Sequence, residues 1–376
     1  VASGDWKLPS VKPLQKVEVA LPATGVDIKP GKEYFMNVEF CLRQDELWAE
    51  AGHVVASDQL VWKNDAPATE AAAAAVKPAV VDDGNFITVT TGQIKAVFCR
   101  ECGSVVSLDV DGRPVMDHRL GEEAAPRLTC MRALVDNDNW LWSRNEIYGQ
   151  GLTQLSWHTG RIDVATAEDG TVTVCMNTTV SGAKSAGFDH KVKWSFNTDG
   201  TATITNDVTP HGHMPAVLPR LGLSLKLDSA LENMEWYGRG PWENYIDRKT
   251  GSFIGRYKST VSEQYETYIR PQDNGYKSDV RWVKFTDETG HGVMFSADVP
   301  LFVQALHYDW EDLEFARHRN GQKRFDSIRE PRREICLNLD IRQLGLGGGS
   351  CGPRPMAKYT PETKVETWTT WVAPAK

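Results

Sequence analysis

The 376-residue chain has no apolar run that approaches the roughly 20 residues needed to span a bilayer. Its first residues, Val1–Trp6, show neither the basic nor the apolar region of a signal peptide. If the chain is a fragment, a signal peptide can still lie upstream of Val1. Basic residues are also few, with 42 Lys and Arg against 50 Asp and Glu and a net charge of -8. Because nucleic acids and anionic membranes bind basic patches, we expect neither as a partner.

Cysteine is scarce as well, with seven residues spread thinly along the chain. Such usage favours free thiols in a reducing compartment and hence a cytoplasmic location, with a periplasmic one left open. Cys99 and Cys102 form one CxxC pair, and no second pair follows at the spacing of a structural zinc site. Because Gly103 and a strand follow instead of a helix, we interpret the pair as part of a hairpin, with a redox pair as the alternative.

Two sequence patterns match the motifs of serine hydrolases and dinucleotide-binding proteins but lack the structural context that these motifs need. Gly348–Gly352 fits G-x-S-x-G, and a G-x-G-x-x-G pattern begins at Gly347. Both motifs need a helix directly afterwards, which Pro353 and Pro355 disfavour. We interpret the run as a flexible loop whose glycines allow close approach of the backbone to a ligand or partner. His211–His213 lacks accompanying metal ligands, so no metal site is predicted there.

Patterns typical of β-strands fill most of the chain, which predicts an all-β protein. Asp111-Gly112, Asp169-Gly170 and Asp199-Gly200 are hairpin signals between alternating runs. So many antiparallel strands predict one large sandwich, because a single sheet would expose an apolar face. One short helix is expected at Asp309–His318, with Asp309 as its cap. The expected strands include Val17–Ala20, Tyr34–Leu42, His53–Trp62, Phe86–Val89, Val105–Val110, Thr171–Val180, Lys191–Phe196, Leu221–Leu227, Val293–Ala297, Leu301–His307 and Val365–Val372.

One stretch, Trp236–Arg248, combines aromatic residues, glycines, a proline and charged residues in a short run. We expect a sharp turn with Gly240 at positive φ, because glycine adopts backbone angles that other residues avoid. Trp242 and Tyr245 have apolar bodies to bury, and the charged residues are expected to pair across the turn. A rigid structural corner is the first interpretation and a carbohydrate contact the second. The corner residues are Trp236, Gly238, Arg239, Gly240, Glu243, Asn244, Tyr245, Asp247 and Arg248, of which Arg239, Glu243, Asp247 and Arg248 are the charged ones.

This corner closely resembles the signature in the C-terminal domain of the large β-galactosidases of glycoside hydrolase family 2. Further segments resemble that family in the same order along nearly the whole chain, which is far more specific than any one motif. Arg132–Asp138 is similar to the family's Arg-Ala-Pro-x-Asp-Asn-Asp segment, with Leu134-Val135 in place of the proline and the variable residue. The other matching segments are Trp48–His53, Pro219–Gly222, Pro271–Gly275 and Gly345–Gly349.

The resemblance implies three parts: a partial immunoglobulin-like sandwich at residues 1–65, a linker at residues 66–83, and a galactose-mutarotase-like super-sandwich at residues 84–376. The alanine run Ala71–Ala75 agrees with a linker. A sandwich without some of its strands leaves edges and apolar faces uncovered, so we expect exposed apolar side chains in the first part.

In the family, both catalytic glutamates and the magnesium and sodium ligands lie in a (β/α)₈ barrel that precedes the region matched here. The sequence holds no alternating βα pattern. The resemblance therefore implies no catalytic residue, no metal and no cofactor in this chain.

The resemblance also implies a supporting role at a sugar site. In the family, two loops of this region border the active site, and here they correspond to Asp136, Asn137, Asp138, Asn139 and Trp140, and to Gly349, Ser350, Cys351 and Gly352. The second loop departs from the family, because it lacks the tryptophan that stacks on the sugar there. Trp140 or Trp142 is the alternative source of an aromatic surface. We expect the two loops to lie on the same side of the large sandwich.

The first functional hypothesis is a non-catalytic C-terminal portion of a β-galactosidase, an enzyme of retaining hydrolysis, that supports the sugar site and assembly. Its partners would be a galactoside or other carbohydrate and the catalytic barrel of the same enzyme, and a homo-oligomer is compatible with it. The second hypothesis is a free-standing carbohydrate-binding or interaction module. The third is an aldose-epimerase-like enzyme, which would need a histidine and a glutamate meeting in the sandwich cleft.

Overall fold

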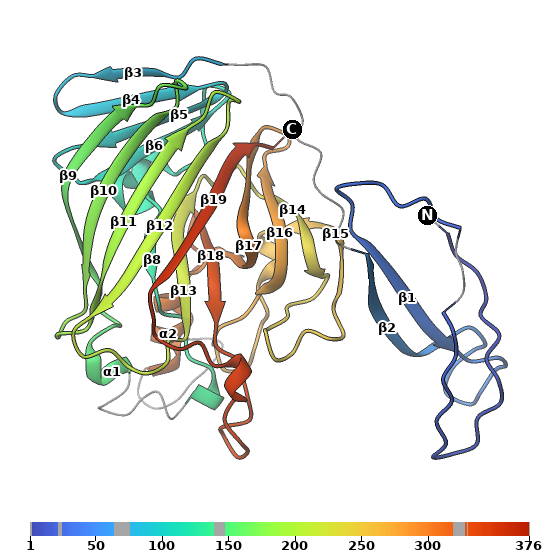
Figure 1. The fold of residues 1–376 in the computed structure, drawn as a ribbon. Coiled ribbons are helices and arrows are strands. Elements are labelled where there is room, and N and C mark those ends of the chain that lie inside the picture. Colours follow the sequence, from blue (N-terminus) through green and yellow to red (C-terminus); the bar gives the residue numbers. More distant parts are fainter. Residues whose placement is uncertain are drawn as a thin grey trace. The chain divides into compact units, whose positions relative to one another are not determined.

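The computed structural model describes residues 2–21, 25–63, 76–138, 147–318, 328 and 330–375. The chain divides into two compact units, Val1–Ala72 and Ala73–Lys376. Both are built from β-structure, and the all-β class predicted from the sequence is confirmed (Figure 1). Among the described residues, no helix has the length and apolar character required to cross a membrane.

The first unit contains a two-stranded antiparallel sheet. Strand β1 (Tyr34–Cys41) pairs with β2 (Val54–Lys63), close to the predicted bounds. The strand expected at Val17–Ala20 does not form, and its residues are exposed, because no strand among the described residues pairs with them. Phe40 and Val61 are 48% and 61% exposed, as expected for a sheet whose apolar faces remain uncovered.

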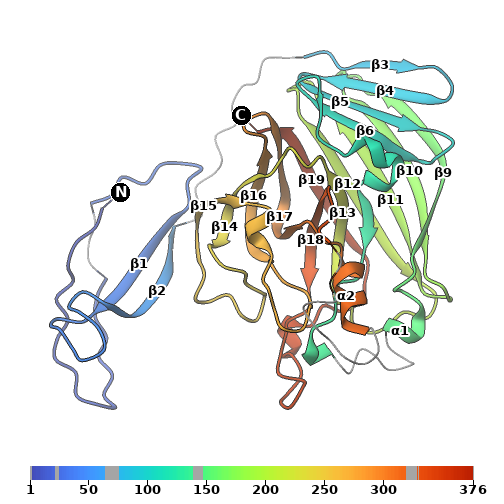
Figure 2. The same ribbon diagram turned by 180° about the vertical axis from the view of Figure 1, so that it is seen from behind.

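The second unit is organised around a curled antiparallel sheet (Figures 1 and 2). In the described residues this sheet has 12 strands, with the main order β15-β14-β16-β17-β19-β12-β11-β10-β9, while β13, β18 and β8 branch from β17. The two runs expected at Val293–Ala297 and Leu301–His307 form one continuous strand, β17. The strands are β8 (Arg127–Thr129), β9 (Ser156–Thr166), β10 (Val172–Ser181), β11 (Gly187–Phe196), β12 (Ala202–His211), β13 (Arg220–Leu227), β14 (Asn233–Gly240), β15 (Phe253–Thr260), β16 (Lys277–Thr286), β17 (Gly292–Leu306), β18 (Ile335–Gln343) and β19 (Glu366–Pro374).

A five-stranded sheet, β3 to β7, packs against this large sheet and completes the sandwich. The alternation of apolar and polar residues in β5 and β11 gives each strand one buried face. At the junction, the rings of Phe98 and Trp194 meet edge to face with centroids 5.7 Å apart. The strands of this sheet are β3 (Ala79–Asp82), β4 (Phe86–Thr91), β5 (Ile94–Cys99), β6 (Ser104–Val110) and β7 (Arg113–Pro114).

Strand β3 lies inside the range predicted as a linker, residues 66–83, and corrects its end. Its four residues pair with β4, from Ala79 opposite Thr90 to Asp82 opposite Ile87. The alanine run Ala71–Ala75 falls outside the described residues.

The α-helices α1 and α2 are short and lie at the end of the sandwich opposite β3 (Figures 1 and 2). The predicted helix is confirmed as α2 (Trp310–His318). Asp312 Oδ2 accepts the Asp309 amide at 2.9 Å, which is the returning half of a capping box, while Asp309 Oδ1 accepts the amide of its neighbour Trp310 at 2.7 Å. The other helical segments are α1 (Ile147–Gln150) and the 3₁₀ turns η1 (His118–Ala124), η3 (Ser262–Gln264) and η6 (Ala357–Tyr359).

The cysteines correct one expectation. Cys99 and Cys102 are joined by a disulfide in the turn between β5 and β6, so the CxxC pair is a hairpin feature but not a pair of free thiols. The turn brings their Cα atoms to 5.3 Å, within the range that a disulfide requires. The remaining cysteines are free, namely Cys41, Cys130, Cys175, Cys336 and Cys351.

Candidate functional site

The predicted corner begins where β14 ends at Gly240. Gly240 does not have a positive φ, which corrects the expected reason for a glycine there. A Cβ at this position would lie 2.6 Å from Cδ2 of Tyr257 and 3.0 Å from Cζ2 of Trp236. Gly238 is similarly enclosed, because its Cβ would lie 2.8 Å from the Cα of Val280. The glycines of the corner therefore permit close packing of neighbouring groups.

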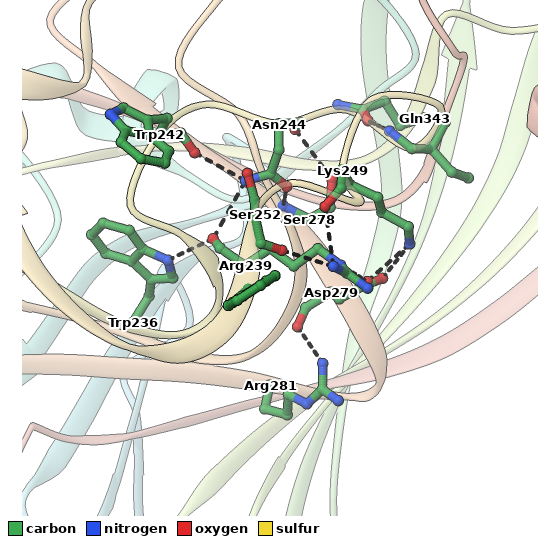
Figure 3. Close-up of polar contacts among 12 residues, drawn as sticks. Trp236, Arg239, Trp242, Asn244, Lys249, Ser252, Ser278, Asp279, Arg281 and Gln343 are labelled. Carbon is green, nitrogen blue, oxygen red and sulfur yellow. Dashed lines mark hydrogen bonds and ion pairs between the residues drawn. The ribbon is translucent and has the colours of Figure 1, made fainter. Parts of the chain in front are cut away.

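Arg239 is paired with an acid outside the corner (Figure 3). Its Nε lies 2.6 Å from Oδ2 of Asp279 on β16, and its NH1 donates to the Ser252 carbonyl at 2.7 Å. Lys249 Nζ joins the same carboxylate at 2.7 Å. Burial works against the charge on Asp279, but hydrogen bonds from Lys249 and Arg239 outweigh it and lower its pKa. The expected pairing of Arg239 within the corner is thus wrong, because β16 lies next to β14 and supplies the acid.

The second arginine of the corner pairs as predicted. Arg248 NH2 lies 2.8 Å from Glu243 Oε1. Glu243 also accepts the Tyr268 hydroxyl and, at 2.9 Å, the Gly275 amide. Within the described part of the chain, Asp247 pairs with no cation; it accepts two backbone amides of the glycine-rich segment, that of Leu346 at 3.0 Å and that of Gly347 at 2.8 Å. The corner is therefore tied to a loop about 100 residues further along the chain.

Two aromatic residues of the corner behave differently. Tyr245 is 1% exposed, as expected, whereas Trp242 is 68% exposed, so the prediction of a buried Trp242 is wrong. The fully buried Asn244 holds this loop by its backbone: its Nδ2 donates to the Trp242 carbonyl at 3.0 Å, and its Oδ1 accepts the Ser278 amide at 2.8 Å. The loop is thus fixed while the indole of Trp242 stays outside.

Next to the corner lies the Asp136–Asp138 segment, which the structure joins to the glycine loop. Asn137 Nδ2 donates to the Gly347 carbonyl at 2.7 Å, and the Ser350 amide donates to Asn137 Oδ1 at 3.1 Å. These described parts of the two loops therefore lie side by side. Asn139, Trp140 and Trp142 fall outside the described residues.

Asp138 is buried and serves a structural role. It is 1% exposed, and both its oxygens lie 3.1 Å from NH2 of the fully buried Arg132. It also accepts the Val135 amide at 3.0 Å. Its carboxylate thus holds the segment in place and does not face solvent.

The glycine loop closes on itself through its backbone. The Gly348 amide donates to the Pro353 carbonyl at 2.9 Å, and the Gly352 amide donates to the Gly348 carbonyl at 2.5 Å. Gly347 has φ +57°, and its Cβ would meet Pro355 at 2.7 Å, so this position requires a glycine. Gly349, Ser350 and Cys351 form the exposed or half-exposed tip.

A polar pocket of about 150 Å³ opens where these segments meet. Sequence reasoning did not assign Tyr268, Gln272 or Asp273 to a site, although the similarity at Pro271–Gly275 was a signal for the last two. The pocket is lined by Val135, Asp136, Asn137, Glu243, Tyr245, Arg248, Tyr268, Gln272, Asp273 and Leu346.

Asp273 is 2% exposed and lies in a buried polar network beneath the pocket. It accepts the Tyr245 hydroxyl and the Gln304 amide, each at 3.0 Å. Burial raises the pKa of its carboxyl to about 7, while the guanidinium groups of Arg132 and Arg220 oppose that rise. Near neutral pH this side chain can therefore exist in either protonation state.

Potential metal ligands gather elsewhere. Within the described residues, Asp117, His118 and Asp228 bring ligand atoms within 4.8 Å of one another, and none of them lines the pocket. Asp117 is already occupied by Arg119, whose Nε lies 2.6 Å from its Oδ1. These contacts make the group a weak candidate for a metal.

One histidine is in contact with a glutamate, and the epimerase hypothesis requires such a pair in the sandwich cleft. His307 Nε2 lies 2.9 Å from Glu232 Oε2. Both side chains are also tied to the backbone, since His307 Nδ1 lies 3.2 Å from the Glu334 carbonyl and Glu232 Oε1 accepts the Ser262 amide at 2.8 Å. Neither residue lines the pocket. These contacts hold the two side chains in place and give the pair a structural role.

Comparison with known families agrees with this architecture. Residues 90–371 match the family described as beta galactosidase small chain, and residues 1–63 match beta-galactosidase, domain 4. The chain therefore belongs to the beta galactosidase small chain family.

Similar proteins include a beta-galactosidase of Priestia megaterium, 29% identical over 320 residues, which are 84% of this chain and 29% of that protein. A beta-galactosidase of Halalkalibacterium halodurans is 30% identical over 344 residues, 90% of this chain and 32% of that protein. This chain thus spans about a third of the length of these relatives. Among solved structures, galactose 1-epimerase from Lactobacillus acidophilus has a TM-score of 0.41 and 8% identity, covering 80% of this chain and 98% of that one.

Proposed function

We propose that this chain is the non-catalytic C-terminal portion of a β-galactosidase and that it forms one wall of the galactoside site. The observation that carries the proposal is the pair of hydrogen bonds by which Asn137 joins two distant segments, at 2.7 Å and 3.1 Å, at the rim of a polar pocket. The family and the beta-galactosidase relatives support this assignment.

The pocket offers the chemistry that sugar hydroxyls need. Carboxylates and an amide oxygen accept hydrogen bonds, whereas the guanidinium of Arg248 and the side-chain amides of Asn137 and Gln272 donate them. Leu346 and Val135 add apolar surface for the C–H groups of a sugar ring.

The acidic residues of the pocket support a non-catalytic role. Retaining hydrolysis uses two carboxylates roughly 5 Å apart, one free to attack and one able to donate a proton. Here Glu243 is occupied by Arg248, Tyr268 and an amide, and Asp273 by Tyr245 and Gln304. Asp136 is paired with Arg270 at 3.1 Å.

The partner in this proposal is the catalytic domain of the same enzyme, which would supply both reacting carboxylates. The magnesium and sodium sites that the resemblance assigns to that domain would lie outside this chain, which itself would need no cofactor. The substrate would be a β-galactoside bound between the two parts.

Hydrolysis of a nitrophenyl β-galactoside tests the proposal. The pure chain is expected to be inactive and to bind galactose weakly, with a Kd at or above about 1 mM. Mixing it with a separately produced catalytic portion should restore hydrolysis. In that mixture Asn137→Ala should raise KM several-fold, whereas Asn177→Ala, an exposed asparagine on β10, should behave as wild type.

Two results would contradict the proposal. One is hydrolysis by the chain alone that a single Asp or Glu substitution abolishes. The other is full activity of the catalytic portion without this chain, with the same KM for the galactoside.

A further inference from the structure

A second, larger groove of about 470 Å³ lies beside the polar pocket. Glu243 and Arg248 line both, so their ion pair forms the wall between the two cavities. We call this second cavity the Trp242 groove. It is lined by Trp242, Glu243, Asp247, Arg248, Lys249, Thr250, Gly251 and Ser252.

The framework under the Trp242 groove is rigid (Figure 3). Asn244 holds the Trp242 carbonyl, and the Trp236 indole donates to the Arg239 carbonyl at 3.0 Å. The Asp279 carboxylate binds both cations, with Arg239 Nε at 2.6 Å and Lys249 Nζ at 2.7 Å. The exposure of Trp242 therefore does not come from a loosely held loop.

An indole that is 68% exposed leaves a large apolar surface in water. Removing such surface from water is favourable by about 25 cal/mol per Å². Figure 3 shows the Trp242 ring turned away from the cluster of Arg239, Lys249 and Asp279. A ligand that covers this ring would gain that free energy without any need for the loop to become ordered first.

The rest of the groove is polar. Arg248 is 57% exposed along its side chain; its NH2 donates to Glu243, and its guanidinium lies 5.5 Å from the centre of the Tyr245 ring. A guanidinium has five N–H donors. Lys249 has three donors and faces Asp279 with part of its ammonium, and Thr250 is exposed. Asp247 accepts one amide at each oxygen and retains lone pairs.

We propose that the Trp242 groove is a second sugar subsite, so that the site of this protein accepts a β-linked galactose oligosaccharide and not only a single galactose unit. One sugar ring would stack its C–H face on the indole, while Arg248, Lys249 and Asp247 meet its hydroxyls. The inference rests on the proposed function, because it extends the same site across the Glu243–Arg248 wall.

The lining favours a sugar over a protein partner. Protein interfaces have an apolar centre to which several side chains contribute. In the Trp242 groove, the indole is the one large apolar side chain, and the other seven residues are charged, hydroxylated or glycine. A single aromatic platform among polar groups matches the amphipathic surface of a sugar ring.

Binding of sugars of increasing length to the full chain tests this subsite. Calorimetry or NMR titration would use galactose and β-linked galactose di- and tetrasaccharides. Wild type is expected to bind the tetrasaccharide about tenfold more tightly than galactose, in line with one added aromatic contact. Trp242→Ala should abolish this difference and leave galactose binding unchanged, while Trp242→Phe should keep most of it.

Trp48→Ala is the matched control, because Trp48 is 65% exposed but belongs to the other compact unit. It should keep the full length dependence. An equal melting temperature of Trp242→Ala and wild type would show that the variant remains folded.

Three results would overturn the subsite. Galactose and the tetrasaccharide could bind wild type equally, which would leave the proposed function standing. Trp242→Ala could weaken association with the catalytic portion and not sugar binding, which would make the groove a protein contact. A chain that binds neither sugar, yet restores hydrolysis when mixed with the catalytic portion, would likewise exclude the subsite and retain the proposed function.

Discussion

Asn137 and Gly347 lie 210 positions apart, and the Asn137 side chain donates to the Gly347 carbonyl at 2.7 Å. The same side chain accepts the amide of Ser350 at 3.1 Å. One amide group thus satisfies both a donor and an acceptor of the glycine loop and sets its distance from the Asp136–Asp138 segment.

Asn137→Ala should loosen the glycine loop with little effect on global stability. A lost hydrogen bond of this kind is worth about 1 kcal/mol, which corresponds to roughly fivefold faster opening. Amide hydrogen exchange at Ser350 is expected to accelerate by about that factor, whereas Asn177→Ala should leave it unchanged. Equal exchange at Ser350 in wild type and Asn137→Ala would mean that the backbone bonds of the loop hold it without Asn137.

Gly240→Val should destabilise the second unit, because its Cβ would lie 2.6 Å from the Tyr257 ring. Overpacking of this kind costs about 1–3 kcal/mol, which a urea or thermal melt would detect. Gly251→Ala is the matched control, since nothing lies within 4 Å of its Cβ and its φ is not positive. Tyr257→Ala in the Gly240→Val background should recover part of the loss. A melt of Gly240→Val that coincides with wild type would show that the ring moves aside freely.

Asp138→Ala should be far more damaging than the loss of a surface acid. It would leave the fully buried Arg132 without its carboxylate, and breaking a buried pair costs about 3–5 kcal/mol. Asp163→Ala removes the partner of Arg161, whose side chain is 85% exposed, and should cost less than about 1 kcal/mol. Denaturant unfolding of the two variants gives the comparison. Similar losses in both would contradict the structural role of Asp138.

Asp273 should make stability decrease as the pH rises. Burial raises its pKa from 3.8 to about 7, against the opposing effect of Arg132 and Arg220, so between these values the folded chain binds a proton that the unfolded chain has released. Asp273→Asn cannot titrate, so its free energy of unfolding should fall less than that of wild type across this window. The measurement is a series of denaturant melts at several pH values.

Asp117 provides a control of opposite sign. Burial opposes its ionisation, but bonding to Arg119 outweighs burial and lowers its pKa below 3.8. The difference in free energy of unfolding between wild type and Asp117→Asn should therefore be fully present above pH 3.8 and shrink as the pH falls further.

The Asp273 prediction is contradicted if the free energies of unfolding of Asp273→Asn and wild type fall in parallel between pH 4 and 7. In that case Asp273 does not carry the expected proton.

Much of the fold could be predicted because its signals are local. Alternation along β11 gives one buried face, and Asp199-Gly200 marks the turn into β12. Asp309 directly precedes α2, and its amide donates to Asp312 Oδ2 within the first turn. The hairpin position of Cys99 followed from the residues around it, whereas the disulfide to Cys102 depends on the geometry of the folded turn.

The site could be predicted only in part. The expectation that the two loops lie on the same side of the large sandwich came from a family resemblance, not from any local pattern. The exposure of Trp242 and the enclosure of Asp138 were missed, because burial depends on which elements pack nearby. Asp273 was noticed in a motif but not as part of a pocket.

The sequence by itself determined many of the strands, several hairpin turns and the helix after Asp309, since these choices depend mainly on groups within a few positions. Only the tertiary structure decided the partners of the charged side chains. Arg239 meets Asp279 and not an acid of its own corner, because β16 lies beside β14 in the sheet. Asp247 likewise binds the amide of Gly347, 100 positions away along the chain. Ion pairs and hydrogen bonds act over a few ångströms, and sheet order, not distance along the chain, sets which groups come that close.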